Sequence, residues 1–131
     1  MHYRGSQYEI FFHYLCNVMT PNKFIGTLFQ SRDAMHLAHL DTNSFAQHMA
    51  LGEYYDGILD FTDSFTEKYF GANGRIPIDI PASKKEEPRE HLKSIGKMIE
   101  AEMNNYSPDL QNIMQDMLGL VNETLYKLTL M

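Results

Sequence analysis

The spacing of charged and apolar residues between positions 44 and 70 limits the fold of this chain more than any other feature. Acidic residues recur there at steps of three, four, three and four: Glu53, Asp56, Asp60, Asp63 and Glu67. In a helix of about 3.6 residues per turn, these carboxylates form one stripe. Apolar residues centre on the opposite side: Ala46, Leu51, Tyr54, Ile58, Phe61, Phe65 and Tyr69. The segment is therefore predicted to be a long amphipathic helix. Its acidic stripe points away from its own core, either into solvent or toward something that arrives from outside.

Helical spacing and capping signals predict three further main helices. Thr20-Pro21 and Ser107-Pro108 each combine a capping side chain with a proline suited to the first helical position. The predicted helices span about residues 20–40, 44–70, 86–105 and 107–130, after a short leading helix at about 8–19. The glycines at 71 and 74 are expected to end the second of these. Residues 75–85 have two prolines and no helical period, so they predict an extended crossover. We expect one all-α domain over residues 1–131, with a helix hairpin on each side of that crossover.

Charge and cysteine content narrow the expected setting. The formal net charge is −6 and Arg4 stands alone as a basic residue near the start, so nucleic-acid binding is disfavoured. Cys16 is the single cysteine, which rules out an internal disulfide and favours a reducing compartment. The apolar run at 8–19 lacks a signal-peptide pattern and is too short to cross a bilayer. We therefore expect a cytoplasmic protein that does not associate with a membrane.

Histidines on both sides of a predicted tight turn at residues 41–44 suggest the position of a metal-binding site. A short turn makes the flanking helices antiparallel neighbours, so His36 and His48 lie at the same end of the hairpin. Along one helix, however, His48 and Asp63 are about 22 Å apart, too far for one ion to bridge. A second copy of the helix, packed antiparallel about a two-fold axis, would bring His48 level with the partner's acidic residues. Such an axis falls near Asp56 or Gly57.

The histidines and the acidic stripe together resemble Dps-type mini-ferritins. That family carries a histidine near the end of its first bundle helix, another twelve residues later, and a D-x-x-x-E segment fifteen residues beyond the second. This sequence has residues at those spacings: His36, His48, Asp63 and Glu67. The resemblance covers residues 21–70 by motif and the rest by helix layout, and it implies a ferritin-like four-helix bundle. It also implies a homo-oligomer in which histidines and carboxylates of two subunits meet across an antiparallel long-helix contact. Fe(II) would bind there and be oxidised for storage or peroxide protection.

The donor chemistry agrees with iron but does not single it out. Imidazole and carboxylate donors suit Fe(II), Mn(II) and Zn(II) alike. The within-subunit di-iron pattern Glu-x-x-His is absent, because Glu90 and His91 are adjacent and so lie on different helix faces. His39 is interpreted as a polar residue at the end of a helix, and His91 is given no role.

Departures from the mini-ferritin pattern favour a second hypothesis. The family's aspartate four residues after the second histidine is Gly52 here, and Glu53 is rotated from that position by about 100°. The family's histidine–tryptophan pair reads His36-Leu37, and there is no basic tail. The hairpin also looks like small phage-encoded ferritin-like proteins of unassigned function, which would place the protein in the host cytoplasm. The alternative is therefore a non-catalytic phage structural or interaction protein with a vestigial metal site.

Overall fold

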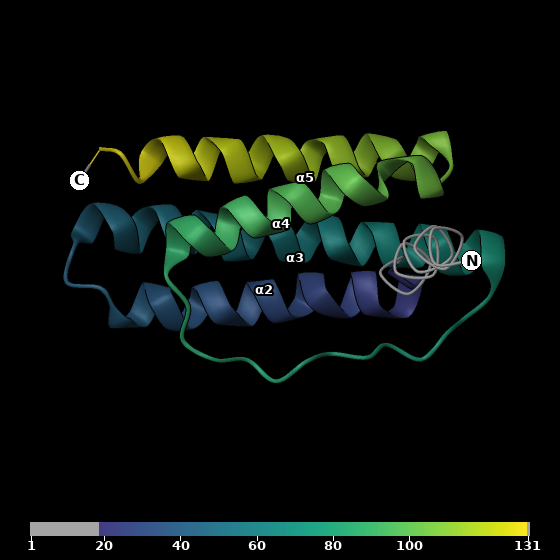
Figure 1. Ribbon diagram of the computed structural model, residues 1–131, viewed down its shortest axis with the longest axis horizontal. Coiled ribbons are helices and arrows are strands. Elements are labelled where there is room, and N and C mark those ends of the chain that lie inside the picture. The colour runs from purple at the N-terminus through teal and green to yellow at the C-terminus, as the bar shows by residue number, and fades with distance from the viewer. Residues whose placement is uncertain (1–18, 131) are drawn as a thin grey trace, which may run out of the picture.

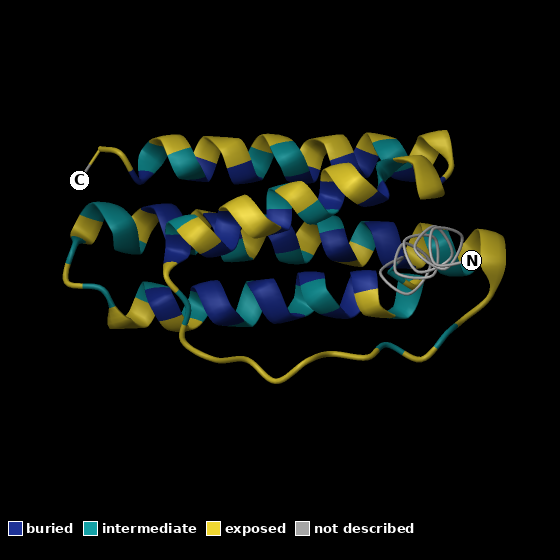
Figure 2. Ribbon diagram, viewed as in Figure 1, coloured by how far each residue is buried: buried dark blue, intermediate teal, exposed yellow. Residues whose placement is uncertain are grey.

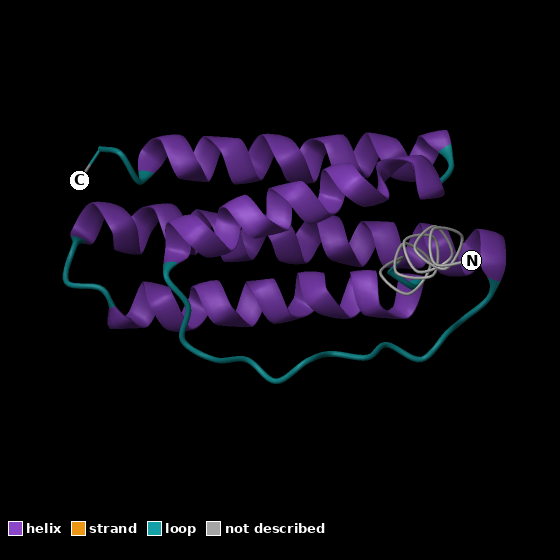
Figure 3. Cartoon of the chain, viewed as in Figure 1, coloured by secondary structure: helices purple, strands orange, loops and turns teal. Residues whose placement is uncertain are grey.

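The computed structural model describes residues 19–130. The leading helix predicted at about 8–19 lies almost entirely outside the described residues. The elements are α2 (Pro21–Asp41), α3 (Phe45–Asn73), α4 (Pro88–Glu102), the short 3₁₀ helix η1 (Met103–Asn105) and α5 (Pro108–Lys127). Figure 3 shows helices joined by loops over this range, with no strand. The prediction of an all-helical bundle of four helices is therefore confirmed.

The four long helices lie side by side around one core. Helix α3 packs against α2 and α5, and α4 packs against α5 and α2. In Figure 2 the buried residues fall on the parts of each ribbon that face the other helices. The largest fully buried side chains come from all four: Phe24, Ile25, Leu28, Met35, Leu51, Tyr54, Ile58, Phe65, Leu92, Ile99, Met114 and Met117. All of them except Met114 were predicted by helical spacing to be buried, and their burial supplies most of the stabilisation of the fold.

Local chemistry explains where the helices begin. The Ser44 hydroxyl accepts a hydrogen bond from the Gln47 backbone N–H at 3.2 Å, which caps α3. The carboxylate of Glu87 caps α4 by accepting the N–H groups of Arg89 and Glu90. Thr20 and Ser107 make no side-chain cap hydrogen bond, so the start of α2 and of α5 is marked better by the proline that follows each residue.

The end of α3 differs from the prediction. The helix does not stop at Gly71 but continues through Asn73 and ends at Gly74, whose φ is +89°. Glycine adopts this left-handed conformation readily, and its N–H donates to the Phe70 carbonyl at 2.8 Å. Gly71 is exposed and tolerates a helical backbone, so the first glycine of the pair did not mark the boundary.

The connection at residues 74–87 has no regular structure and passes along the outside of the bundle (Figure 1). It starts at the end of α3 and returns to the opposite end of the molecule, so α3 and α4 run in the same direction. It lies against α2 at Gly26, where a Cβ atom would be only 1.8 Å from the Asp79 carbonyl oxygen. Glycine is therefore required at that position of α2. Within residues 19–130, no helix is long and apolar enough to span a membrane.

Candidate functional site

The hairpin of α2 and α3 brings the predicted histidines together. His39 from α2 and His48 from α3 stack with their ring centroids 3.7 Å apart. Their hydrogen bonds are reciprocal: His39 Nδ1 donates to the His48 carbonyl at 2.6 Å, and His48 Nδ1 donates to the His39 carbonyl at 2.9 Å. Because a carbonyl can only accept, both Nδ1 atoms carry the proton, and in the neutral rings both Nε2 atoms keep a lone pair.

These two hydrogen bonds fasten the turn of the hairpin. The His39 carbonyl lies in the last turn of α2, where helix carbonyls lack a partner within the helix. His48 supplies that partner from the neighbouring helix. The interpretation of His39 as a polar end-of-helix residue was therefore incomplete, because its half-buried ring is a structural tie between α2 and α3.

Gly52 has a physical explanation in the same contact. A Cβ atom at this position would lie 3.2 Å from Cε1 and 3.3 Å from Nδ1 of His39. The imidazole thus occupies the space that a side chain at position 52 would need. The aspartate that mini-ferritins carry here would require the His39 ring to shift by a few tenths of an ångström.

His36 belongs to the same aromatic group. Its ring stacks on Tyr55 with centroids 4.1 Å apart, and it meets His39 edge-on at 5.9 Å. Arg32 approaches the Tyr55 ring, with 5.4 Å between its guanidinium carbon and the ring centroid. The sequence therefore correctly predicted that His36 and His48 share one end of the hairpin.

The predicted carboxylate ligands lie elsewhere on α3. Asp63 and Glu67 are exposed and are fifteen and nineteen residues beyond His48, so one chain does not bring the four predicted ligands together. Within residues 19–130, no group of three or more His, Cys, Asp or Glu side chains is arranged to hold a metal ion. A site built from these residues would need a second copy of the chain, so the shared site stays a prediction.

The outward stripe of α3 changes character along its length. All five predicted acidic residues are exposed, and Glu53 forms an ion pair with Lys127 at 2.6 Å. Phe45 and Met49 fall on the same stripe, about two turns and one turn before Glu53, and are 76% and 49% exposed. An antiparallel contact centred on Asp56 would place Phe45 level with the partner's Glu67 and Met49 level with the partner's Asp63. The sequence analysis did not consider these two residues.

Exposed apolar side chains gather at this end of the bundle. Among the described residues, seven large apolar side chains are exposed, and six lie where α2 ends, α3 begins and α5 ends. Leu37 and Leu40 of α2, at 46% and 67% exposure, join Phe45 and Met49 within about two turns of the connection. We call these four residues the hairpin patch. Tyr126 and Leu130 belong to the end of α5, and Ile80 lies apart in the crossover.

Beneath this end lies a buried chain of polar groups that the sequence did not reveal. The His91 ring joins Glu86 at 3.1 Å through Nδ1 and the Ser31 hydroxyl at 2.7 Å through Nε2. Ser31 in turn bonds the Tyr54 hydroxyl at 2.7 Å. With a neutral imidazole, Tyr54 donates to Ser31, Ser31 to His91, and His91 to the Glu86 carboxylate, so every group is satisfied. The chain ties α2, α3 and α4 together.

A carboxylate, an imidazole and a hydroxyl in this order also form the catalytic triad of hydrolases. Hydrolysis is excluded here because a substrate cannot reach the hydroxyl. Ser31 and Tyr54 are 0% exposed, so no substrate reaches the Ser31 hydroxyl in this structure. Burial opposes ionisation of Glu86, yet hydrogen bonds from His91 and Gln30 outweigh it and lower the pKa of that carboxyl. Burial raises the pKa of the Tyr54 hydroxyl well above its usual value. These groups hold the fold together.

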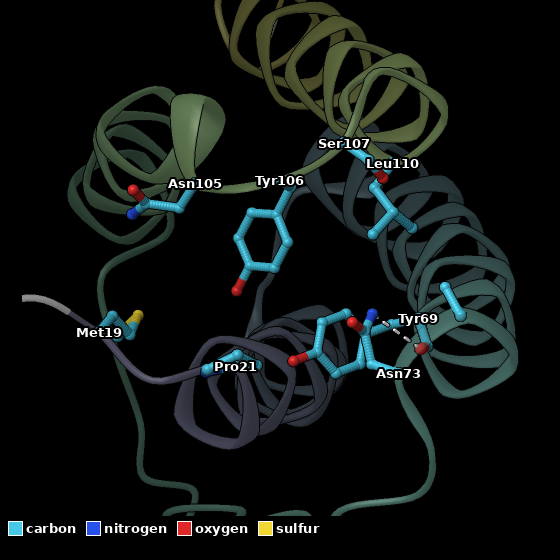
Figure 4. Close-up of a pocket in the computed structure, with 9 residues that line it drawn as sticks. Met19, Pro21, Tyr69, Asn73, Asn105, Tyr106, Ser107 and Leu110 are labelled. Carbon is cyan, nitrogen blue, oxygen red and sulfur yellow. Dashed lines mark hydrogen bonds between the residues drawn. The ribbon is translucent and has the colours of Figure 1, made fainter.

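The opposite end of the bundle has a cavity of about 420 Å³. Figure 4 shows its lining, with the Tyr106 and Tyr69 rings, Asn73 and Asn105 around an opening next to Met19. The two tyrosine rings meet edge-on at 6.2 Å, and Asn73 donates to the Tyr69 carbonyl. Burial raises the pKa of Tyr106. Amides and phenols supply neither a metal-ligand set nor an acid–base pair, so this cavity is no candidate for the predicted chemistry.

Residues 39–128, more than half of the chain, match a protein family of unknown function, DUF5856, and the chain belongs to that family. A relative in Enterobacteria phage T4 is described as an uncharacterized 14.6 kDa protein in the mobD-ri intergenic region. It is 28% identical over 113 residues, which cover 83% of this chain and 88% of the phage protein. No solved structure matches. These matches fit a small phage-encoded protein of unknown function, as one of the two resemblances suggested.

Proposed function

We propose that this protein is a non-catalytic helical-bundle interaction protein that works by docking another protein surface on the hairpin patch. One observation supports this most: six of the seven exposed large apolar side chains in residues 19–130 gather at one end of the bundle. Scattered surface apolar residues are normal, whereas a group of them rimmed by charges is typical of an interaction site. Leu37, Leu40, Phe45 and Met49 form the part of this surface that flanks the hairpin turn.

The interior of the hairpin supports the same function. The reciprocal hydrogen bonds of His39 and His48 and the contact with Gly52 hold the two helix ends in one arrangement. A surface whose backbone is fixed in advance loses little conformational entropy on binding.

A photoreactive residue in the patch tests this proposal. A benzoylphenylalanine at position 40 or 45 should form covalent adducts with another polypeptide in cells that produce the full chain. The same residue at position 80 is the matched control, because Ile80 is 50% exposed but lies in the crossover. Adducts from 40 and 45, and far fewer from 80, are expected. Equal labelling from all three positions, or none from 40 and 45, would refute a docking role for the patch.

The second candidate is the ferritin-like one: a Dps-like protein that takes Fe(II) as substrate at a site shared by two subunits. His36 and His48 of one chain would act with Asp63 and Glu67 of the other. The observation in its favour is the anchoring of His48, whose Nδ1 is fixed by a carbonyl while Nε2 keeps its lone pair. Metal-binding histidines use this arrangement. The pairing of α2 with α3 and of α4 with α5, separated by a long connection, also suits a ferritin-like bundle.

In this second function the chain's own residues would bind and orient the ion. Iron would supply one-electron chemistry toward dioxygen or peroxide, and Mn(II) or Zn(II) would suit the same donors. The interaction function ranks first because the antiparallel contact centred on Asp56 sets exposed Phe45 and Met49 against carboxylates.

Subunit mixing tests the shared site directly. A chain carrying His36→Ala and His48→Ala is mixed with a chain carrying Asp63→Asn and Glu67→Gln, and bound metal is counted by elemental analysis. Neither chain alone should bind, and a mixed pair should regain one of its two sites. Glu100→Gln on the exposed face of α4 is the control for loss of charge. Unchanged metal content after both His48→Ala and Glu67→Ala would refute the shared site.

A further inference from the structure

The size of the hairpin patch indicates what kind of surface it can accept. The exposed fractions of its four side chains correspond to roughly 400 Å² of apolar area, the size of the largest apolar patch on a typical monomer, which is often functional. A standard interface takes about 800 Å² from each partner, and somewhat more than half of it is non-polar. The patch is therefore large enough to supply the apolar part of one side of a standard protein–protein interface.

Charges of both signs occur around the patch, unlike in the far half of the α3 stripe. Three ion pairs lie on its rim: Arg32–Asp33 at 3.0 Å, Lys85–Asp41 at 2.7 Å and Lys127–Glu53 at 2.6 Å. The whole chain carries a formal charge of −6, and the far half of the α3 stripe is entirely acidic. Two copies would repel each other along that acidic half but not at the hairpin patch. In a two-fold contact each copy presents the same surface to the other. A rim that carries both positive and negative residues lets opposite charges of the two copies face each other.

The chain's own undescribed residues start far from the patch. Residues 1–18 join the described structure at Met19, just before α2 begins, whereas the patch lies where α2 ends (Figure 1). The length of α2, about 31 Å for 21 residues, separates the two places, so a segment docked on the patch would first have to pass along the whole of α2.

We propose that the occupant of the hairpin patch is a second copy of this chain, packed patch to patch about a two-fold axis. This inference rests on the docking role proposed above and names its partner. The axis lies at the hairpin end of α3, not at Asp56 as the shared metal site would require. Asp63 and Glu67 remain outside the interface, and association needs no metal.

Mass in solution tests the inference. The full chain has a mass of 15.2 kDa, and sedimentation in the presence of a chelator should show a concentration-dependent species of twice that mass. Leu40→Ser combined with Phe45→Ser should weaken association at least a hundredfold, because burial of each large apolar side chain contributes more than a factor of ten. Both side chains are mostly exposed in one chain, so helix content and melting temperature should not change. Ile80→Ser is the control and should associate like the wild type.

Each outcome bears on a different step. A wild-type chain that stays monomeric at every concentration overturns the second copy as partner, and so does a dimer that the double variant leaves intact. If position 45 nevertheless gives adducts with a different polypeptide, the docking role stands and only the partner was wrong. If position 45 gives no adduct at all, both proposals fail. Should the double variant not fold, Leu40→Gln alone makes the same comparison with a smaller expected change.

Discussion

The two halves of the outward stripe of α3 have the same helical spacing but different chemistry. The first half presents Phe45 and Met49 to solvent, next to the half-buried imidazoles of His39 and His48. The second half presents Asp60, Asp63 and Glu67, all exposed. Exposure of the apolar side chains in the first half to water is unfavourable. The carboxylates of the second half are well solvated in the same position. The comparison shows that the acidic stripe predicted from residues 53–67 continues toward the hairpin turn as exposed apolar side chains.

The largest effect should come from making the first half like the second. Phe45→Glu together with Met49→Glu extends the acidic stripe into the hairpin patch. We expect self-association to weaken by a factor of a hundred or more, which corresponds to about 2.7 kcal/mol. Both positions are exposed, so the fold should be unchanged. Analytical ultracentrifugation over a range of concentrations measures the change. A dimer that persists would show that the two halves do not differ in the way proposed.

A smaller effect, on the stability of the fold, is expected when one glycine from each half of α3 is substituted. Gly52→Asp places a side chain against the His39 ring, which its hydrogen bond to the His48 carbonyl holds in place. We expect the free energy of unfolding to fall by about 1–3 kcal/mol, the usual cost of overpacking. Gly71→Ala is the control, because nothing lies within 4 Å of its added Cβ and helical alanine is favoured over glycine by about 1 kcal/mol. Urea denaturation of both variants checks the prediction. Equal stabilisation by the two substitutions would mean that His39 yields easily.

Acid should distinguish the two ends of the bundle. The pKa of Glu86 is lowered from its ordinary value of 4.5, because hydrogen bonds from His91 and Gln30 outweigh the effect of burial. The ionised carboxylate therefore stabilises the fold above that value, and the contribution is lost as the pH falls through the folded-state pKa. We expect Glu86→Gln to be less stable than the wild type at pH 7 and to lose less stability on acidification.

Asp109 is the matched carboxyl at the other end. Its pKa is also lowered, mainly by a hydrogen bond with its neighbour Ser107, but the side chain is exposed and links no helices. Asp109→Asn should therefore change the pH dependence of the melting temperature less than Glu86→Gln. The opposite ranking would argue against the polar chain as a tie between helices.

The smallest effect should come from the acidic half itself. Asp60→Asn with Asp63→Asn removes exposed charge from a stripe that the dimer leaves in solvent. Association should strengthen by less than threefold, because like charges on separate chains are screened at physiological salt. A large loss of association, especially one reversed by divalent metal, would instead favour the contact centred on Asp56.

The fold was largely accessible from the sequence, because helical spacing alone placed Phe24, Ile25, Leu92 and Val121 in the core. The histidine cluster was accessible as well, since a short turn brings His36 and His48 to the same end. Other features needed three dimensions. The hydrogen bond between His91 and Ser31 joins residues sixty positions apart. Helical spacing does not predict which residues of α2 and α4 lie opposite each other. Helical spacing also places Phe45 and Met49 on the outward stripe, but the sequence analysis followed only the charged residues there, so their exposure emerged from the structure.

Cysteine trapping in the absence of metal tests the central claim most directly. A side chain near a two-fold axis faces its own copy, so a cysteine there forms a disulfide between subunits when the Cβ atoms lie about 3.5–4.5 Å apart. In a Cys16→Ser background, Leu40→Cys, Phe45→Cys and Met49→Cys are oxidised in parallel with Asp56→Cys. We expect a covalent dimer from at least one patch position and none from position 56. Trapping at 56 alone would contradict the account and place the axis where the shared metal site requires it.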